Sequence, residues 1–223
     1  MNCDVCNYAI DGLYYTDAYG KKGHQHHEFC DCCTGFIIGK PHHQTDGRKN
    51  CTICQSNSVN DRLSGREARS QVYELFKKVG ISFPENDITL IVNDKTFAVE
   101  KWNSRNFYGR LITNYKQSLI GTTTKYTIYI LSGLHKVIFN SVLAHELMHV
   151  WQHEHTIELS ELENEGLCEL VCYYILDASQ TRIGKVAMKQ MEKSKDQIYG
   201  DGFRLMKSRF EKVGNWNTFL KGL

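Results

Sequence analysis

The stretch Ala144-His145-Glu146-Leu147-Met148-His149 lies inside an apolar, helix-forming run and carries the pattern H-E-x-x-H. Two histidines four residues apart on a helix share one face, where they can hold one zinc ion. Glu146 projects beside that face and can take a proton from a zinc-bound water. An ordinary amphipathic helix is the alternative, since the chain has ten histidines. The stretch predicts a helical zinc centre with its own base, which is typical of zinc metallopeptidases.

A catalytic zinc needs a third protein ligand and one open position. His155 has the spacing of H-E-x-x-H-x-x-G-x-x-H, but the glycine that permits a sharp turn is absent, so a continuing helix carries His155 roughly 9 Å past His149. Glu165, on an expected second helix, is the predicted third ligand, and Glu161 is the off-register alternative. Glu169, one turn beyond Glu165, would accept a hydrogen bond from a zinc histidine. This layout resembles that of the gluzincin peptidases, whose third ligand is a helical glutamate.

The first quarter of the chain contains four pairs of metal-type residues at regular spacing. Each pair can clip one zinc from a tight turn, and two pairs close a tetrahedral structural site. A disulfide framework is the alternative, but it leaves the histidines unexplained. The spacing resembles the LIM domain, although its fourth ligand is usually cysteine; His26 could stand in for His27. The predicted zinc ligands are Cys3, Cys6, His24 and His27 for one ion, and Cys30, Cys33, Cys51 and Cys54 for the next, whereas Cys32, His42 and His43 fit no position.

Composition divides the chain and excludes some classes of protein. Seven of the nine cysteines precede residue 55, which predicts a zinc-binding module over 1–57 and a second domain over 58–223. The formal net charge of +2 is spread along the chain, so no nucleic-acid partner is expected. The sequence contains no run of 18 apolar residues, so no membrane span is predicted, and its start lacks a signal-peptide pattern. We therefore expect a cytoplasmic protein with reduced cysteines.

Local patterns in the second domain predict an α+β fold with a short sheet, an active-site helix and C-terminal helices. Capping boxes at Ser64–Glu67 and Ser160–Glu163 mark the starts of two helices. The expected elements are helices over 64–79 and 160–178, a helix carrying the H-E-x-x-H pattern, strands over 88–92, 111–115 and 126–131, and a C-terminal helical stretch broken at 200–202.

Several segments together resemble a known family. A LIM module precedes Ala-His-Glu-Leu-Met-His-Val-Trp at 144–151, then Glu-Gly-Leu-Cys at 165–168 and Tyr-Gly-Asp-Gly-Phe-Arg at 199–204. This series resembles the ubiquitin-activated LIM peptidases that limit organ size in plants, and their shorter bacterial relatives. The resemblance implies a cytosolic zinc endopeptidase that makes limited cuts in protein substrates. It also implies that the LIM module binds a partner protein.

The expected mechanism uses His145, His149 and Glu165 as zinc ligands and Glu146 as the base that activates water. Tyr199, or else Arg204, would stabilise the developing oxyanion. A protein or peptide substrate would add as a strand along 126–131. The alternative is a LIM-type adaptor whose peptidase-like domain is inactive or structural, against which Glu146 argues because a structural site needs no base.

Overall fold

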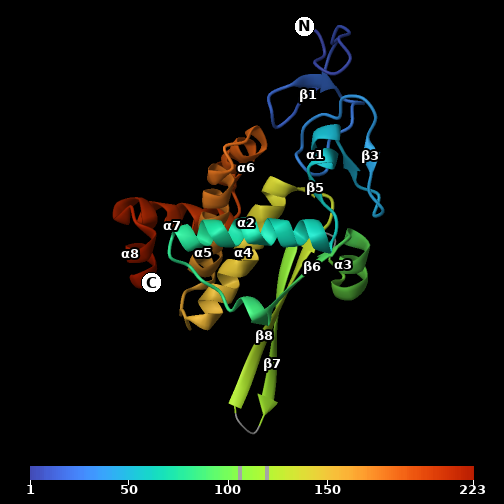
Figure 1. Ribbon diagram of the computed structural model, residues 1–223. Helices are drawn as coiled ribbons and strands as arrows, with labels where there is room; N and C mark the ends of the chain where they lie inside the picture. The colour runs from blue at the N-terminus through green and yellow to red at the C-terminus, as the bar shows by residue number, and fades with distance from the viewer. Residues whose placement is uncertain (105–106, 119–120) are drawn as a thin grey trace.

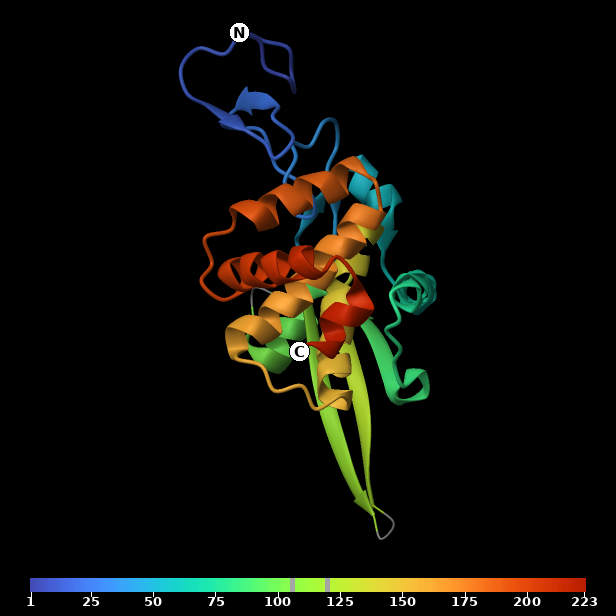
Figure 2. The same ribbon diagram turned by 90° about the vertical axis from the view of Figure 1, so that its left-hand side faces the viewer.

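A computed structural model describes residues 1–104, 107–118 and 121–223 as a mixed α/β protein with small sheets and several helices (Figure 1). The N-terminal module projects from one end of the body, and a two-stranded arm projects from the other (Figures 1 and 2). No helix of the described residues is long and apolar enough to cross a membrane.

The N-terminal module consists of short hairpins joined by turns. Its strands pair with near neighbours in the sequence and run antiparallel. A small segment with few apolar residues forms little hydrophobic core and relies for stability on cross-links such as bound metal ions. The elements are β1 (Tyr14–Thr16) paired with β2 (Lys22–His24), β3 (His42–His43) paired with β4 (Lys49–Asn50), and the single-turn helix α1 (Thr52–Ser56).

The main sheet has the order β6-β8-β7, with β6 (Ile88–Asn93) parallel to β8 (Gly121–Leu131) and β7 (Gly109–Ser118) antiparallel to it. The residues of β8 near its end are buried and those near the tip of the arm are exposed. The expectation that substrate adds along 126–131 is wrong, because β8 is the central strand and its backbone groups are paired on both sides. The free edges belong to β6 and β7.

Helix α4 (Lys136–Glu154) lies at the centre of the body and is buried on nearly every side. It contacts β7 and β8 as well as α2 (Arg62–Lys78) and α5 (Glu161–Ala178). An apolar surface all round a helix is what such a position requires. Leu143 and Leu147 are fully buried, and each contributes about 1.5–3 kcal/mol through the hydrophobic effect.

The C-terminal helices pack together beside α5. Helices α6 and α7 run side by side and contact α5 (Figure 2). The helices whose bounds have not yet been given are α3 (Lys95–Trp102), α6 (Arg182–Lys193), α7 (Tyr199–Val213), α8 (Trp216–Lys221) and a 3₁₀ turn at Glu85–Asp87.

Two expected helix boundaries need correction. The first helix is capped by Asp61, which accepts a hydrogen bond from Ser64 N, so the box lies three residues before the predicted one. The C-terminal break lies at 194–198, whereas Gly200 and Gly202 belong to the first turn of α7. These glycines serve close packing, not a turn, because a Cβ on Gly202 would lie 2.3 Å from the Leu162 carbonyl oxygen of α5. The capping box at Ser160 is confirmed.

The N-terminal module is attached to the body by specific polar contacts. Directly after the predicted boundary at residue 57, the two-residue strand β5 (Ser58–Val59) pairs with β9 (Leu134–His135) of the body. Arg48 and Asn50 donate hydrogen bonds to the Ser132 and Gly133 carbonyl oxygens, both at 2.7 Å. Cys32 accepts a hydrogen bond of 3.1 Å from the His135 backbone N–H. The module therefore has a fixed position on the body.

Candidate metal centres and active site

Three side chains from two helices converge between α4 and α5. His145 and His149, one turn apart on α4, bring their Nε2 atoms to 3.2 Å. Glu165 of α5 places Oε2 at 3.2 Å from His145 Nε2 and Oε1 at 3.5 Å from His149 Nε2. The two nitrogens and the carboxylate thus face one small volume, which is the donor set of a His₂Glu zinc site.

The outer nitrogens of both histidines also have partners. His145 Nδ1 lies 3.1 Å from Glu169 Oε1, as predicted from the spacing. His149 Nδ1 lies 3.1 Å from Gln152 Oε1 and 3.4 Å from Cys168 Sγ. Such contacts fix the tautomer and the orientation of a metal-binding imidazole. Gln152 and Cys168 are not among the predicted site residues. Each nevertheless lies three residues after a predicted ligand, Gln152 after His149 and Cys168 after Glu165, and so shares its helix face.

The electrostatics of this cluster suit a divalent cation. Burial lowers the pKa of His149, but contacts with Cys168 and Glu165 outweigh burial and raise that pKa to about 10. Burial likewise opposes ionisation of Glu165, yet the two nearby histidines lower its pKa to about 2. Glu165 Oε2 is buried, and its 3.2 Å ion-pair contact with His145 Nε2 is not a hydrogen bond, so among the described residues this oxygen has no hydrogen-bond partner. A bound zinc ion would displace the protons that the histidines and Glu165 share, so these residues fit the metal.

Glu146 lies beside the cluster and is only 7% exposed. Burial raises the pKa of its carboxyl group, which the nearby histidines partly offset. The start of β7 passes directly over it, because a Cβ on Gly109 would lie 2.7 Å from Glu146 Oε1 and 2.6 Å from Val142 Cγ1. Gly109 therefore leaves room for the carboxylate, a role that no motif around this residue indicates.

A cleft of about 480 Å³ opens next to His145 and Glu146. Its walls come from α4, α5, α6 and α7, and Tyr199 stands at its side, 47% exposed. Asp31, Cys32 and Thr34 of the N-terminal module form part of the lining, and Gln190 Nε2 of α6 donates a 3.2 Å hydrogen bond to Thr34 Oγ1. The module therefore shapes the cleft directly. The lining residues that come from the body are Tyr108, Gly109, Ile138, Ser141, Val142, His145, Glu146, Glu169, Cys172, Leu176, Ala187, Gln190, Met191 and Tyr199.

The alternative third ligands lie elsewhere. Helix α4 continues to Glu154, as expected, and His155 stacks on Trp151 with ring centroids 4.3 Å apart. His155 Nδ1 also lies 2.8 Å from the Trp151 carbonyl oxygen. Glu161 is the exposed first residue of α5, one turn before Glu165. Within the described part of the chain, the clusters of metal-type residues around His145 contain His149, Cys168, Glu169 and Cys172, and they include neither His155 nor Glu161. They do not include Glu165 either, whose assignment rests on its contacts with the two histidines.

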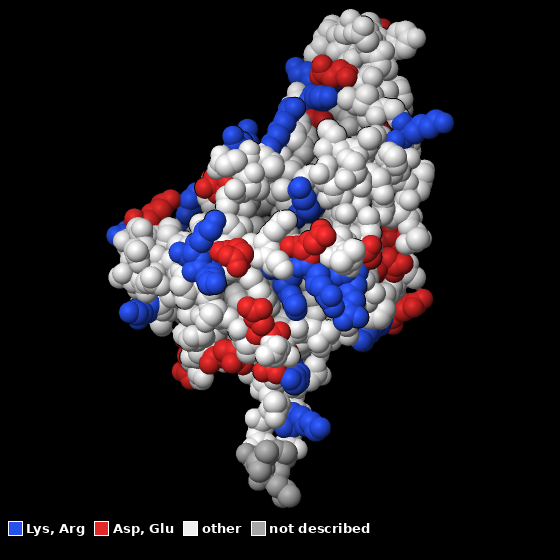
Figure 3. Space-filling model, viewed as in Figure 1, with Lys and Arg blue, Asp and Glu red and all other residues white. Residues whose placement is uncertain are grey.

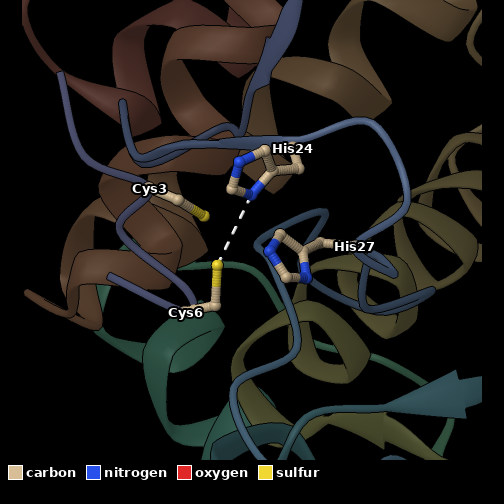
Figure 4. Close-up of side chains that lie close together, drawn as sticks. All are labelled: Cys3, Cys6, His24 and His27. Carbon is tan, nitrogen blue, oxygen red and sulfur yellow. Dashed lines mark hydrogen bonds between the residues drawn. The ribbon is translucent and has the colours of Figure 1, made fainter. Parts of the chain in front are cut away.

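The N-terminal module contains the two predicted clusters. Cys3, Cys6, His24 and His27 point toward one another (Figure 4), and their ligand atoms lie within 4.8 Å of each other. Cys6 Sγ is 3.4 Å from His24 Nδ1, and His27 Nε2 is buried without a hydrogen-bond partner in the described structure. The second set, Cys30, Cys33, Cys51 and Cys54, meets the same distance criterion. Both sets can hold a zinc ion.

The thiol of Cys3 is set up for metal binding. Burial raises its pKa, but hydrogen bonds involving the backbone of Cys6, Val5 and His24 outweigh burial and lower the pKa to about 5. A thiolate is the form that binds zinc. His26 packs against His27 with ring centroids 4.4 Å apart but is not part of the cluster.

Comparison with known proteins places the chain in a family. The family model described as "DA1-like: Protein DA1" matches residues 67–186, which is more than half of the sequence. The chain belongs to the DA1-like family. Protein DA1 of Arabidopsis thaliana is 22% identical to it, and the aligned region covers 95% of this chain and 54% of the plant protein. The chain thus spans about half the length of this curated relative. No solved structure matches it.

Residues 199–204 of this DA1-like chain lie outside the region that the family model matches. The ring of Tyr199 is 6.4 Å from that of His145, and burial together with Glu165 raises the pKa of its phenol. Arg204, the other candidate for oxyanion stabilisation, pairs with Asp201 and donates a 2.7 Å hydrogen bond to the Ser194 carbonyl oxygen. Arg204 therefore holds the turn before α7, whereas Tyr199 lines the cleft.

Proposed function

We propose that this DA1-like chain is a zinc-dependent endopeptidase of the gluzincin type that makes limited cuts in protein substrates. The observation that carries the proposal is the convergence of His145, His149 and Glu165 beside a cleft that His145 lines, together with the buried Glu146 in the same cleft wall. A purely structural zinc site would close with a fourth protein ligand and would need neither a base nor a cleft.

The three ligands would hold the zinc ion, which when bound polarises a peptide carbonyl and makes water a stronger acid. Glu146 would accept the proton of the attacking water and deliver it to the departing amine. Its burial raises the pKa of its carboxyl group, which brings the group closer to the pH at which it must both take and give a proton. Tyr199 would donate a hydrogen bond to the oxyanion.

The free edge of β7 is the best place for an extended substrate. Strand β7 begins at Gly109, directly over the Glu146 carboxylate, and its outer edge is unpaired among the described strands. A substrate segment that adds to this edge would pass over the metal ligands with its backbone held by hydrogen bonds. We therefore propose the edge of β7 for the substrate, in place of the central strand β8.

The N-terminal module would hold two structural zinc ions and bind or position a protein partner. Its contacts with α6 and β9, and its contribution to the cleft wall, support a role in shaping what the cleft admits. We further propose that the protein acts in the cytoplasm as a short, bacterial-type member of the family.

The test compares wild-type protein with Glu146→Gln on an unfolded protein substrate, with bound zinc measured in parallel. We expect three zinc ions per chain in both proteins and a loss of at least about 10²-fold in cleavage rate for the variant, because an amide cannot accept the proton. Glu161→Gln, on the exposed start of α5, is the matched control and should cleave normally. Equal cleavage by the Glu146 variant would overturn the peptidase and favour the adaptor alternative.

A further inference from the structure

A second groove lies at the other edge of the main sheet, away from the metal ligands. It runs between α2 and the edge strand β6 and encloses about 530 Å³. None of its lining residues belongs to the cleft beside His145. The lining residues are Arg62, Gly65, Arg66, Arg69, Glu85, Ile88, Thr89, Leu90, Ile91 and Val92.

The helix wall of this groove is strongly basic. Arg62, Arg66 and Arg69 follow one another at helical spacing, so they share one face of α2. Among the described residues neither Arg62 nor Arg66 forms an ion pair, and Glu85 is the only acidic residue in the lining. Figure 3 shows lysine and arginine side chains near the centre of this face of the molecule, with aspartate and glutamate side chains beside them. The groove therefore favours a ligand with negative charge.

The other wall offers backbone hydrogen-bonding groups. Strand β6 pairs with β8 on one side only. Arg69 donates a 3.3 Å hydrogen bond to the Ile88 carbonyl oxygen, which therefore faces the groove. Since backbone groups alternate in direction along a strand, those of Leu90 and Val92 face the same way. Apart from the Ile88 carbonyl oxygen, which Arg69 occupies, this edge of β6 has no strand partner in the described parts of the chain, and such an edge is a template for a further strand.

The absence of a side chain at Gly65 sets how closely the two walls approach. A Cβ there would lie 2.9 Å from Val92 Cγ2. The arginines on either side of Gly65 in the sequence thereby line the same groove as β6. Arg62 and Arg66 are about 6 Å apart along the helix axis, close to the roughly 6.6 Å between alternate side chains of a strand.

We propose that this groove binds an extended acidic segment of a partner protein, which adds to β6 as a strand while its carboxylates pair with Arg62 and Arg66. Strand addition supplies backbone hydrogen bonds, and the arginines supply selectivity for acidic side chains. A nucleic acid would match the arginines but not the row of backbone donors and acceptors on β6. The proposal does not depend on peptidase activity.

The experiment measures fluorescence anisotropy of a labelled nine-residue peptide of alternating Glu and Val with the full-length, zinc-loaded protein. We expect saturable binding that weakens as salt rises, and no binding of the matching Lys–Val peptide. Arg62→Ala with Arg66→Ala should weaken binding by at least about tenfold. Lys77→Ala with Lys78→Ala removes the same charge from the far end of α2 and should change binding less than about twofold.

Two further probes separate strand addition from simple charge attraction. The same Glu–Val peptide, N-methylated at alternate residues to block one edge, should lose at least about tenfold in affinity. An oligothymidylate of equal formal charge should bind at least about tenfold more weakly than the peptide. Equal binding of the oligothymidylate, no effect of N-methylation, or equal effects of the arginine and lysine pairs would each overturn the proposal.

Discussion

Replacing Gly166 by alanine should disturb both the fold and the metal centre, because this glycine is where α5 and α7 cross. A Cβ at residue 166 would lie 2.3 Å from the Gly202 carbonyl oxygen and 2.8 Å from its Cα atom. Ordinary contact begins near 3.4 Å, so the helices must separate by about 1.1 Å. The atoms in the way are backbone atoms, which cannot rotate aside as a side chain can.

The expected cost follows from two opposing effects. Alanine favours the helix over glycine by about 1 kcal/mol, whereas overpacking costs about 1–3 kcal/mol and lies at its upper end against rigid backbone. The net change is a loss of about 2 kcal/mol in the free energy of unfolding. Metal sites tolerate shifts of only about 0.2 Å, and Glu165 is the neighbouring residue, so affinity for the third zinc ion should also fall.

Urea unfolding followed by tryptophan fluorescence measures the stability, and competition with a chromophoric chelator measures the zinc affinity. Gly202→Ala should behave in the same way, since its Cβ would lie 2.3 Å from the Leu162 carbonyl oxygen. Gly222→Ala is the control, because its Cβ would meet its nearest atom at 3.5 Å. Unchanged stability and zinc affinity in Gly166→Ala would refute the close-crossing argument.

Other predictions concern the metal ligands. Glu165→Ala should reduce bound zinc from three ions to two while His155→Ala keeps three; the reverse ranking in elemental analysis would refute the assignment. His27→Ala should also leave two ions, and a count of three would show that His26 takes its place. Zinc affinity at the site of His145 and His149 should rise between about pH 6 and pH 8, by up to about tenfold per pH unit for each proton displaced. The reason is that protons compete with zinc for His149, whose pKa without metal is raised to about 10. A pH-independent affinity in a chelator competition would contradict this competition.

Patterns within one or two helical turns were enough to predict the local chemistry of this protein. The four-residue spacing of His145 and His149 places them on one helix face whatever surrounds the helix. The paired cysteines and histidines of the first module form turns whose ligands are neighbours in the chain, and the clusters match the pairs that the spacing indicates. The capping box at Ser160 likewise depends on residues within one turn.

Tertiary structure decided how the helices and strands meet. Glu161 and Glu165 lie one turn apart on α5, and only the return of α5 along α4 brings Glu165 to the histidines. The central place of β8 depends on pairing between strands far apart in the sequence, so periodicity within 126–131 could not reveal it.

Glycine at 202 shows the same distinction most plainly. A Gly-Asp-Gly segment in the sequence is typical of a turn, yet it forms the first turn of α7, where it lets that helix lie against α5. The same crossing holds Glu165 near His145, so the packing of α7 helps to position a metal ligand on another helix. Such contacts are governed by distances between backbones, which local sequence patterns do not encode.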